Sequence, residues 1–449
     1  MDVKVFGSSI LHKDFSLKSL PQVSPPPSKS HSIRFLILAT LAKTSSYIKN
    51  ILESQDIDSC YICLKELGAN FEKINNDNGT YDVKVFAPKG GIKNYVKQKD
   101  KIVLNVGNSG SLLYFLSMLV SQLPCTFYIL GDSSIKKRPI APIIEALNEL
   151  GVAYNVPDIP NGIITIYGKT HETIIDITLE GKFSQVVSGL LLSTPFLHKG
   201  VNIKLKKKGE APYLEMSLKH LKKRGIKIEV SKELNFYSLR GEQSTDGFIE
   251  TCPNDWSSAC FLALFSIASL SPIAINGLSL EDGQADKKLL YYLKKLLCPC
   301  TFKNGVLSIL HKDYCMKGTN FNLSKTPDAL PSLACIASLA KGITKLKGIE
   351  ICRHKESDRV SAIANELKKL GIFIKEEENS LTIERNGKLK SGMHLNSYGD
   401  HRIALSLIAF CLSLPKDKHC IIENAECCSI SYPNFIKDLK MCGARIERV

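Results

Sequence analysis

The sequence predicts an α/β protein of two domains, each made of three repeated helix-and-strand modules. One short phrase, a helical turn that ends in a Leu-Gly-like pair and runs into a strand, recurs six times in the 449 residues. With Cys298 standing in for glycine in the degraded fourth copy, positions 68, 151, 225, 298, 371 and 443 are 83, 74, 73, 73 and 72 residues apart. That period is too long for solenoids with units of about 33 residues and fits six small α/β subdomains. The copies are Leu64–Ala69, Leu147–Val152, Leu221–Ile226, Leu293–Cys298, Leu367–Ile372 and Leu439–Ala444.

Each glycine is expected to end a helix, because glycine adopts the left-handed C′ conformation that satisfies the last carbonyls. Apolar runs between these phrases predict further helices, and several of them follow Ser, Asn or Asp residues suited to capping a helix. A helix start is also a natural anion site, since its free N–H groups and its dipole both favour negative charge. The predicted helices cover 33–41, 111–120, 140–150, 186–192, 257–266, 330–340, 360–370 and 403–412.

Two segments in which the chain is expected to pass from one domain to the other divide the six modules into three and three. The first is the proline-rich loop that ends near residue 26, and the second lies between residues 241 and 249. We therefore predict one domain at 27–248 and another formed by 249–449 together with the first strand in 1–26.

Composition places the chain among ordinary folded proteins. It is 44% hydrophobic and 23% charged, and it is long enough for at least two cores. The start of the chain lacks a signal peptide and no apolar run reaches the length of a membrane span, so we expect a cytoplasmic protein. The 15 cysteines are odd in number and scattered, so we interpret them as reduced thiols, including the C-x-x-C pair Cys60 and Cys63.

The net charge of +15 leaves two interpretations open. It fits a surface for nucleic acid, or a basic shell around a site for anionic small molecules. Many of the lysines lie at predicted helix ends, where they complement the helix dipole. No RNA-recognition signature interleaves the basic residues with aromatic ones, which favours small anions.

Polar clusters stand at the starts of several predicted helices. Residues 27–34 place Lys29, three serines and Arg34 before an apolar helix, an arrangement suited to phosphate but also to simple capping. Residues 107–111 form a small-residue turn that would let a ligand approach the backbone. In the second half, residues 353–359 pack six ionisable groups into seven positions, and two further charged clusters begin at Pro327 and Asp400.

Taken in order, these clusters resemble the enolpyruvyl transferases, and within them the branch that acts on shikimate 3-phosphate. The similarity runs nearly end to end and implies an inside-out α/β barrel of two domains, with six βαβαββ-type units and an active site between the domains. The matching residues are Ser28-Lys29-Ser30, Arg34, Gly107-Asn108-Ser109-Gly110, Lys137-Arg138-Pro139, Ser184-Gln185, Pro212-Tyr213, Asp255-Trp256-Ser257-Ser258-Ala259, Pro327-Asp328, Lys355-Glu356-Ser357-Asp358-Arg359 and Asp400-His401-Arg402.

The resemblance implies transfer of the enolpyruvyl group of phosphoenolpyruvate to the 5-hydroxyl of shikimate 3-phosphate, with release of phosphate. The residues implied for shikimate 3-phosphate are Lys29, Ser30, Arg34, Ser184, Gln185, Tyr213, Asp328 and Lys355. Those implied for phosphoenolpyruvate are Lys29, Asn108, Gly110, Arg138, Gln185, Arg359 and Arg402. The planar fork of arginine suits carboxylate and phosphate oxygens.

The same resemblance assigns the acid–base chemistry. Asp328 is the expected base for the hydroxyl, Lys29 and Glu356 are the expected proton carriers, and His401 supports them. We expect no metal, no cofactor, no nucleic-acid or membrane partner, and a monomer. Because Gly110 leaves room beside the substrate, glyphosate should compete with phosphoenolpyruvate.

Four departures from the family pattern bear on substrate affinity. Ile430 stands where many members have Lys, Ile351 where some have Asn, Tyr114-Phe115 where Arg-Pro is common, and Phe183 where a second Ser often occurs. Two alternatives stay open at this point. One is the sister enzyme that uses UDP-N-acetylglucosamine, although the cysteine typical of its loop is missing from residues 133–138. The other is a nucleic-acid-binding protein on the same fold.

Overall fold

The computed structural model describes residues 1–8, 20–76, 80–157, 159, 161–197, 199–207, 209–310, 315–385 and 387–449. The chain forms two compact units, which we call the N-terminal unit (Pro27–Pro253) and the C-terminal unit (Met1–Pro26 with Asn254–Val449). The unit boundary lies five residues after the predicted 248/249. The reason is that strand β14 (Ile249–Thr251) pairs in parallel with β3 (Ser46–Ile51) and so belongs to the N-terminal unit.

Each unit contains three four-stranded sheets of one common pattern among the described residues. A parallel pair of strands is extended by two antiparallel strands, and the same order is found in all six sheets. In the N-terminal unit the sheets are β14-β3-β5 (Tyr81–Phe86)-β4 (Asn70–Asn75), β6 (Lys101–Asn105)-β7 (Thr126–Leu130)-β9 (Gly162–Tyr167)-β8 (Ala153–Asn155), and β10 (Ile175–Leu179)-β11 (Gly200–Leu205)-β13 (Phe236–Arg240)-β12 (Ile228–Val230).

The sheets of the C-terminal unit take in both ends of the chain. β1 pairs with β23 and β24, so the first strand joins this unit as the sequence predicts. The sheets are β22 (His394–Asn396)-β23 (His419–Glu423)-β1 (Val3–Phe6)-β24 (Ile446–Arg448), β2 (Gln22–Val23)-β15 (Ile273–Ile275)-β17 (Val306–Ile309)-β16 (Cys300–Lys303), and β18 (Asn320–Asn322)-β19 (Ile343–Lys347)-β21 (Ser380–Glu384)-β20 (Phe373–Glu377).

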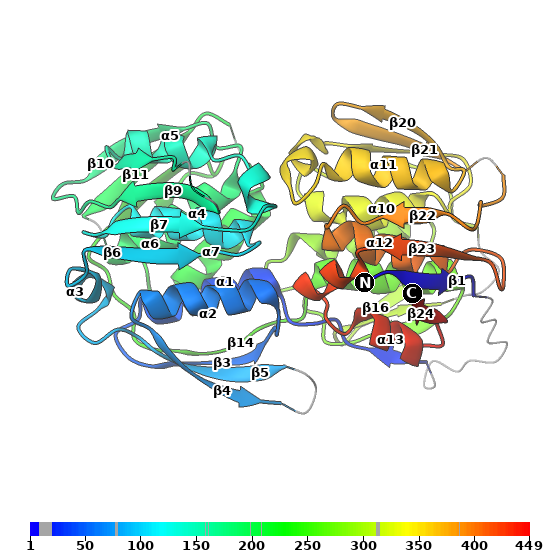
Figure 1. Ribbon diagram of the computed structural model, residues 1–449, viewed down its shortest axis with the longest axis horizontal. Helices are drawn as coiled ribbons and strands as arrows, with labels where there is room; N and C mark the ends of the chain where they lie inside the picture. Colours follow the sequence, from blue (N-terminus) through cyan, green and yellow to red (C-terminus); the bar gives the residue numbers. More distant parts are fainter. Residues whose placement is uncertain are drawn as a thin grey trace. The chain divides into compact units, whose positions relative to one another are not determined.

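Helices fill the interior of each unit, and the sheets lie outside them (Figure 1). Three almost fully buried helices pack together in each unit because apolar side chains surround them on every side. They are α1 (Lys29–Thr40), α4 (Gly110–Val120) and α6 (Ser184–Leu197) in one unit, and α8 (Trp256–Ser269), α10 (Leu330–Ala337) and α12 (His401–Cys411) in the other. All six helices were predicted, with ends that differ by a few residues.

Outer helices with one apolar face complete the modules. They are α2 (Gln55–Glu66), α5 (Ala141–Glu149), α7 (Ala211–Lys223), α9 (Leu289–Lys295), α11 (Arg359–Lys369) and α13 (Phe435–Met441), with the short α3 (Ile92–Val96) as an addition. Five 3₁₀ turns also occur in the described residues: η2 (Ile135–Lys137), η3 (Ala285–Lys288), η4 (Pro327–Ala329), η5 (Glu350–His354) and η6 (Ala425–Ile430).

The six repeated phrases are the ends of these six outer helices. In each copy the N–H of the last residue donates to the carbonyl of the first, as Ala69 does to Leu64, which is the six-to-one bond of a Schellman motif. The predicted stand-in for glycine in the fourth copy was wrong. Leu297 has the left-handed backbone with φ of 60°, while Cys298 donates the six-to-one bond to Leu293.

Each unit has its own hydrophobic core, which extends from the buried helices to the inner faces of the three sheets. No described helix has the length and hydropathy needed to cross a membrane. All 15 cysteines are free thiols, and Cys60 and Cys63 are buried on α2. Within the described residues no three His, Cys, Asp or Glu side chains gather as ligands for a metal ion.

Candidate active site

In the N-terminal unit, the polar residues predicted to bind substrate lie at the starts of the buried helices. Helix α1 begins at Lys29, so Lys29 and Ser30 lie in its first turn, four residues earlier than the apolar pattern indicates. The ammonium of Lys29 lies 2.8 Å from a carboxylate oxygen of Asp56, which is buried at the start of α2. Sequence reasoning did not identify Asp56 as the partner that fixes this lysine.

Arg34 is buried one turn further along α1, and three bonds fix its guanidinium. It donates to the hydroxyl of Ser217 at 2.9 Å and to the carbonyls of Ser30 at 2.9 Å and Tyr213 at 3.3 Å. Its guanidinium also lies 4.9 Å from the centre of the Phe115 ring. Burial lowers its pKa to about 10, so the group remains a cation at neutral pH.

The turn before α4 brings Gly110 and Arg138 together. A Cβ atom on Gly110 would lie only 3.0 Å from Nη1 of Arg138, so any larger residue here would require the guanidinium to shift. Asn108, in the same turn, donates to the hydroxyl of Ser134 at 2.8 Å and to the carboxylate of Asp132 at 3.2 Å. The small residues therefore seat an arginine against the start of a buried helix.

The start of α6 is tied to two neighbouring helices. Ser184 donates to the buried carboxylate of Glu210 at 2.7 Å, just before α7, and Gln185 donates to Ser111 of α4 at 3.1 Å. Because this bond links the two helix starts, their positive dipole ends lie near each other. Such a group of helix starts, together with nearby cations, is suited to anionic ligands.

Two of the departures from the family pattern contact each other. The rings of Tyr114 and Phe183 stack with centroids 6.2 Å apart, and the hydroxyl of Tyr114 donates to the carbonyl of Pro139 at 2.8 Å. The stack links α4 to the residue that precedes Ser184. Tyr114 and Phe183 therefore connect α4 to the chain segments that carry Arg138 and Ser184.

In the C-terminal unit, a buried arginine holds the carboxylates that the sequence places in three separate segments. Arg359, which is 1% exposed, donates to Asp400 at 2.8 Å and to Asp328 at 2.8 Å, and it also pairs with Glu356. Asp400 caps α12 by accepting the N–H of Arg402 at 2.9 Å. Helix starts of α11 and α12 and the turn η4 thus meet at one guanidinium.

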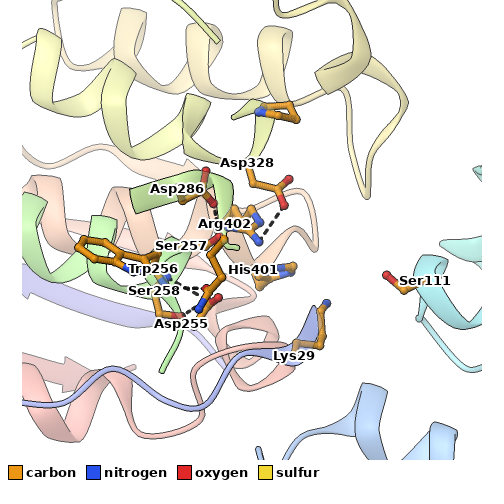
Figure 2. Close-up of polar contacts among 12 residues, drawn as sticks. Lys29, Ser111, Asp255, Trp256, Ser257, Ser258, Asp286, Asp328, His401 and Arg402 are labelled. Carbon is orange, nitrogen blue, oxygen red and sulfur yellow. Dashed lines mark hydrogen bonds and ion pairs between the residues drawn. The ribbon is translucent and has the colours of Figure 1, made fainter. Parts of the chain in front are cut away.

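Asp328 accepts from a second arginine as well. Its other oxygen lies 3.1 Å from Nη2 of Arg402, and this ion pair is drawn in Figure 2. Burial acts to raise the pKa of Asp328, but Arg402, Lys355 and Arg359 outweigh it and lower that pKa well below its usual range. Asp328 is therefore a carboxylate at neutral pH in the structure described here.

A buried acidic group that the sequence did not reveal lies beside this ion pair. Asp286, at the start of the C-terminal unit's turn η3, accepts a bond from Ser257 of α8 (Figure 2). Burial and the charge of Asp328 raise the pKa of Asp286 to about 6, although Arg402 opposes the shift. Asp255 caps the same helix by accepting from the N–H of Ser258 at 2.9 Å.

His401 is buried at the start of α12, with its Nδ1 4.0 Å from a carboxylate oxygen of Asp400. Lys355 lies close enough to Asp328 for its positive charge to lower the pKa of that carboxyl group. The structure thus gathers Asp328, Lys355, Glu356, Arg359, His401 and Arg402 in the C-terminal unit, and Lys29, Ser30, Arg34, Asn108, Gly110, Arg138, Ser184, Gln185 and Tyr213 at helix starts or neighbouring turns of the N-terminal unit. The role of each residue in binding stays a prediction.

Comparison with known proteins identifies the family. The model of the family "EPSP synthase (3-phosphoshikimate 1-carboxyvinyltransferase)" matches residues 20–439. The chain belongs to the EPSP synthase family. It is 33% identical to the 3-phosphoshikimate 1-carboxyvinyltransferase of Ruminiclostridium cellulolyticum over 95% of this chain and 97% of that protein. It is 34% identical to the protein of the same name from Methanocaldococcus jannaschii over 95% of this chain and 96% of the relative.

A solved EPSP synthase structure from Acinetobacter baumannii has the same fold, with a TM-score of 0.77 and 23% identity over 99% of each chain. The predicted enolpyruvyl transferase fold is thereby confirmed. In this EPSP synthase family member, Ile430 is buried in η6 and Ile351 packs against the core of the C-terminal unit. Both departures thus serve as apolar packing groups.

Proposed function

We propose that this protein transfers the enolpyruvyl group of phosphoenolpyruvate to the 5-hydroxyl of shikimate 3-phosphate. The observation that carries the proposal is the buried cluster in which Arg359 and Arg402 both bind Asp328. Two buried guanidinium groups and nearby Lys355 suit substrates that carry phosphate and carboxylate groups. Family membership supports the same reaction.

We propose that both units supply binding residues. In the N-terminal unit, Lys29, Arg34 and the start of α6 would hold shikimate 3-phosphate, and Arg138 would hold phosphoenolpyruvate beside Gly110. Nη1 of Arg138 lies close to Gly110 at the start of α4, so the guanidinium charge and the helix dipole both favour an anion at this place. The acting molecule is proposed to be a single chain.

The ion pairs of the C-terminal unit suggest how Asp328 becomes a base. Without substrate, Arg402, Lys355 and Arg359 stabilise its charged form and make it a weak proton acceptor. When a substrate phosphate or carboxylate takes bonds from these cations, their effect on Asp328 decreases and its pKa rises. Binding of the anions would therefore activate the carboxylate that takes the proton of the 5-hydroxyl.

The remaining steps need one proton donor and one proton acceptor at the methylene carbon. The substrate oxygen adds to the central carbon of phosphoenolpyruvate while the methylene carbon gains a proton. Loss of phosphate and of a proton from the new methyl group then restores the double bond. Glu356, held by Arg359, and Lys29, held by Asp56, are the proposed proton carriers. His401 would support them from the start of α12.

The test is phosphate release from the purified protein supplied with phosphoenolpyruvate alone, with shikimate 3-phosphate, or with UDP-N-acetylglucosamine. We expect release only with shikimate 3-phosphate. Asp328→Asn should lower kcat by about 10²- to 10⁴-fold, the range typical of general acid–base catalysis. Asp438→Asn is the matched control, because Asp438 accepts from Tyr432 at 2.8 Å and has no proposed role.

Release with UDP-N-acetylglucosamine instead would assign the sister reaction. Release with neither acceptor, or equal turnover by the Asp328 and Asp438 variants, would contradict the proposal. The proposed monomer is checked separately by light scattering on the eluting protein.

A further inference from the structure

A basic and aromatic pocket lies on the C-terminal unit among residues that the proposed reaction does not use. Its volume is about 590 Å³, within the range of sites that hold small organic ligands. Helix α9 and turn η3 supply Lys288, Tyr291 and Lys295, and the strands β18 and β19 supply Phe321 and Lys347. The pocket therefore has walls from two different sheet-and-helix modules.

The charge in this pocket has one sign. Its described lining residues are lysines, aromatic residues and two asparagines, with no carboxylate among them. None of the three lysines forms an ion pair with a described acidic residue. Lys345, two residues before Lys347 on β19, shows the contrast because it pairs with Glu377 at 2.9 Å.

Lys295 illustrates how the cations of the pocket are held without a counter-charge. Its ammonium donates to the carbonyl of Asn320 at 2.9 Å and lies 5.7 Å and 5.5 Å from the ring centres of Tyr291 and Phe321. Burial and the nearby charge of Lys325 lower the pKa of Lys288. Positive charges crowded in this way attract an anion more strongly than isolated surface lysines do.

The aromatic wall gives the pocket a second feature. Tyr291 is 55% exposed although it is a large ring, and it forms a T-shaped pair with the buried Tyr292, with the ring centroids 5.8 Å apart. An exposed tyrosine ring is a surface on which a planar ring can stack. A ligand that combines a planar ring with phosphate would use both the exposed ring and the lysines.

We propose that this pocket binds a nucleotide-like ligand, in which Lys288, Lys295 and Lys347 hold the phosphates and Tyr291 stacks on the ring. Lysine binds phosphate as a point charge and needs no fixed geometry, which suits an open pocket. Tyr292, which lines the pocket, forms a 2.5 Å hydrogen bond with Thr326. Thr326 lies two residues before Asp328, so this bond connects the pocket to the segment that carries Asp328. The proposal does not depend on the reaction proposed above.

The test uses ADP and pyrophosphate as probes in calorimetric titrations of the full chain, each carried out without and with saturating shikimate 3-phosphate. We expect ADP to bind saturably and more tightly than pyrophosphate. The triple variant Lys288→Gln, Lys295→Gln and Lys347→Gln should weaken ADP binding at least tenfold. Tyr291→Ala should remove the advantage of ADP over pyrophosphate and leave pyrophosphate binding unchanged.

The matched control is the triple variant Lys204→Gln, Lys222→Gln and Lys227→Gln, which removes the same charge from exposed positions of the N-terminal unit. It should change ADP affinity less than twofold. Equal weakening by both triple variants would overturn the proposal, because diffuse charge would then explain the binding. Loss of ADP binding when shikimate 3-phosphate is added, no binding at millimolar ADP, or binding of single-stranded RNA but not ADP would also overturn it.

Discussion

Arg359→Met should test whether the buried arginine organises the carboxylates of the C-terminal unit. Removing it leaves Asp400, which is fully buried, and Asp328 and Glu356, which are 16% and 12% exposed, without their shared cation. Breaking a buried ion pair by removing one partner costs about 3–5 kcal/mol. Total stability is typically about 5–15 kcal/mol, so the variant should fold but with a much smaller margin.

Arg353→Met is the matched control. Arg353 also binds two carboxylates, those of Asp358 at 2.8 Å and Glu376 at 2.9 Å, but these are 39% and 24% exposed. Water screens such pairs, and exposed pairs contribute about 0–1 kcal/mol. Urea denaturation at pH 7.5 should therefore show a deficit several times larger for Arg359→Met than for Arg353→Met.

The pH dependence of the deficit gives an independent check. The folded state lowers the pKa of Asp328, so this group contributes stability above the unfolded pKa of about 3.9, and that contribution is lost as pH falls. Without Arg359 the pKa of Asp328 is lowered less, so acid removes less stability from the variant. The gap between wild type and Arg359→Met should therefore stay nearly constant from pH 7.5 to about pH 5 and narrow from about pH 5 to about pH 3. A deficit below 1 kcal/mol at pH 7.5, or a gap that widens in acid, would refute this reasoning.

Four further outcomes are expected. Gly225→Ala should destabilise the protein by about 1 kcal/mol in thermal unfolding, because its φ is +74° and a Cβ would meet no atom within 4 Å, so that only backbone strain acts; an unchanged melting temperature would contradict this. Burial and the imidazole of His31 lower the pKa of His220 in the folded protein. Below the unfolded His pKa of about 6.5 the unfolded chain therefore binds more protons than the folded one, and the wild type should lose stability from pH 6.5 to pH 5. His220→Gln should lose less over that range in urea titrations, and an equal loss would show that another group is responsible. Tyr114→Phe removes the hydrogen bond to the carbonyl of Pro139, worth about 1 kcal/mol, and should raise KM for phosphoenolpyruvate about fivefold. An unchanged KM would show that this hydrogen bond does not support substrate binding. Glyphosate should inhibit competitively with phosphoenolpyruvate beside Gly110, and full activity at millimolar glyphosate would exclude this.

The helix ends were predictable because their chemistry is local. A left-handed residue after the last turn and the bond from its neighbour back to the helix involve only six consecutive residues, which recur in every module. The fourth copy was misread because a leucine at the left-handed position gives no signal in the sequence. Leu297 adopts φ of 60° despite its Cβ, a conformation that costs most residues other than glycine about 1–2 kcal/mol.

The substrate-binding candidates were predictable to the extent that they follow a family pattern. Their partners were not predictable in the same way. Asp56 and Glu210 fix Lys29 and Ser184, and each lies 26 or more residues away in the chain. Asp286 lies 29 residues from Ser257, and its raised pKa depends on burial and on the charge of Asp328.

The sequence by itself determined the six modules, their buried helices and the kinds of residue that bind anions, because periodicity and helix-end chemistry act over a few residues. Only the tertiary structure decided which carboxylate meets which cation. Arg359 binds Asp328 and Asp400 from segments 31 and 41 residues away, and a pKa depends on all charges and on the burial that such folding creates. The same holds for the lysine pocket, where turn η3, helix α9 and strand β19 bring together three lysines that have no described carboxylate partner.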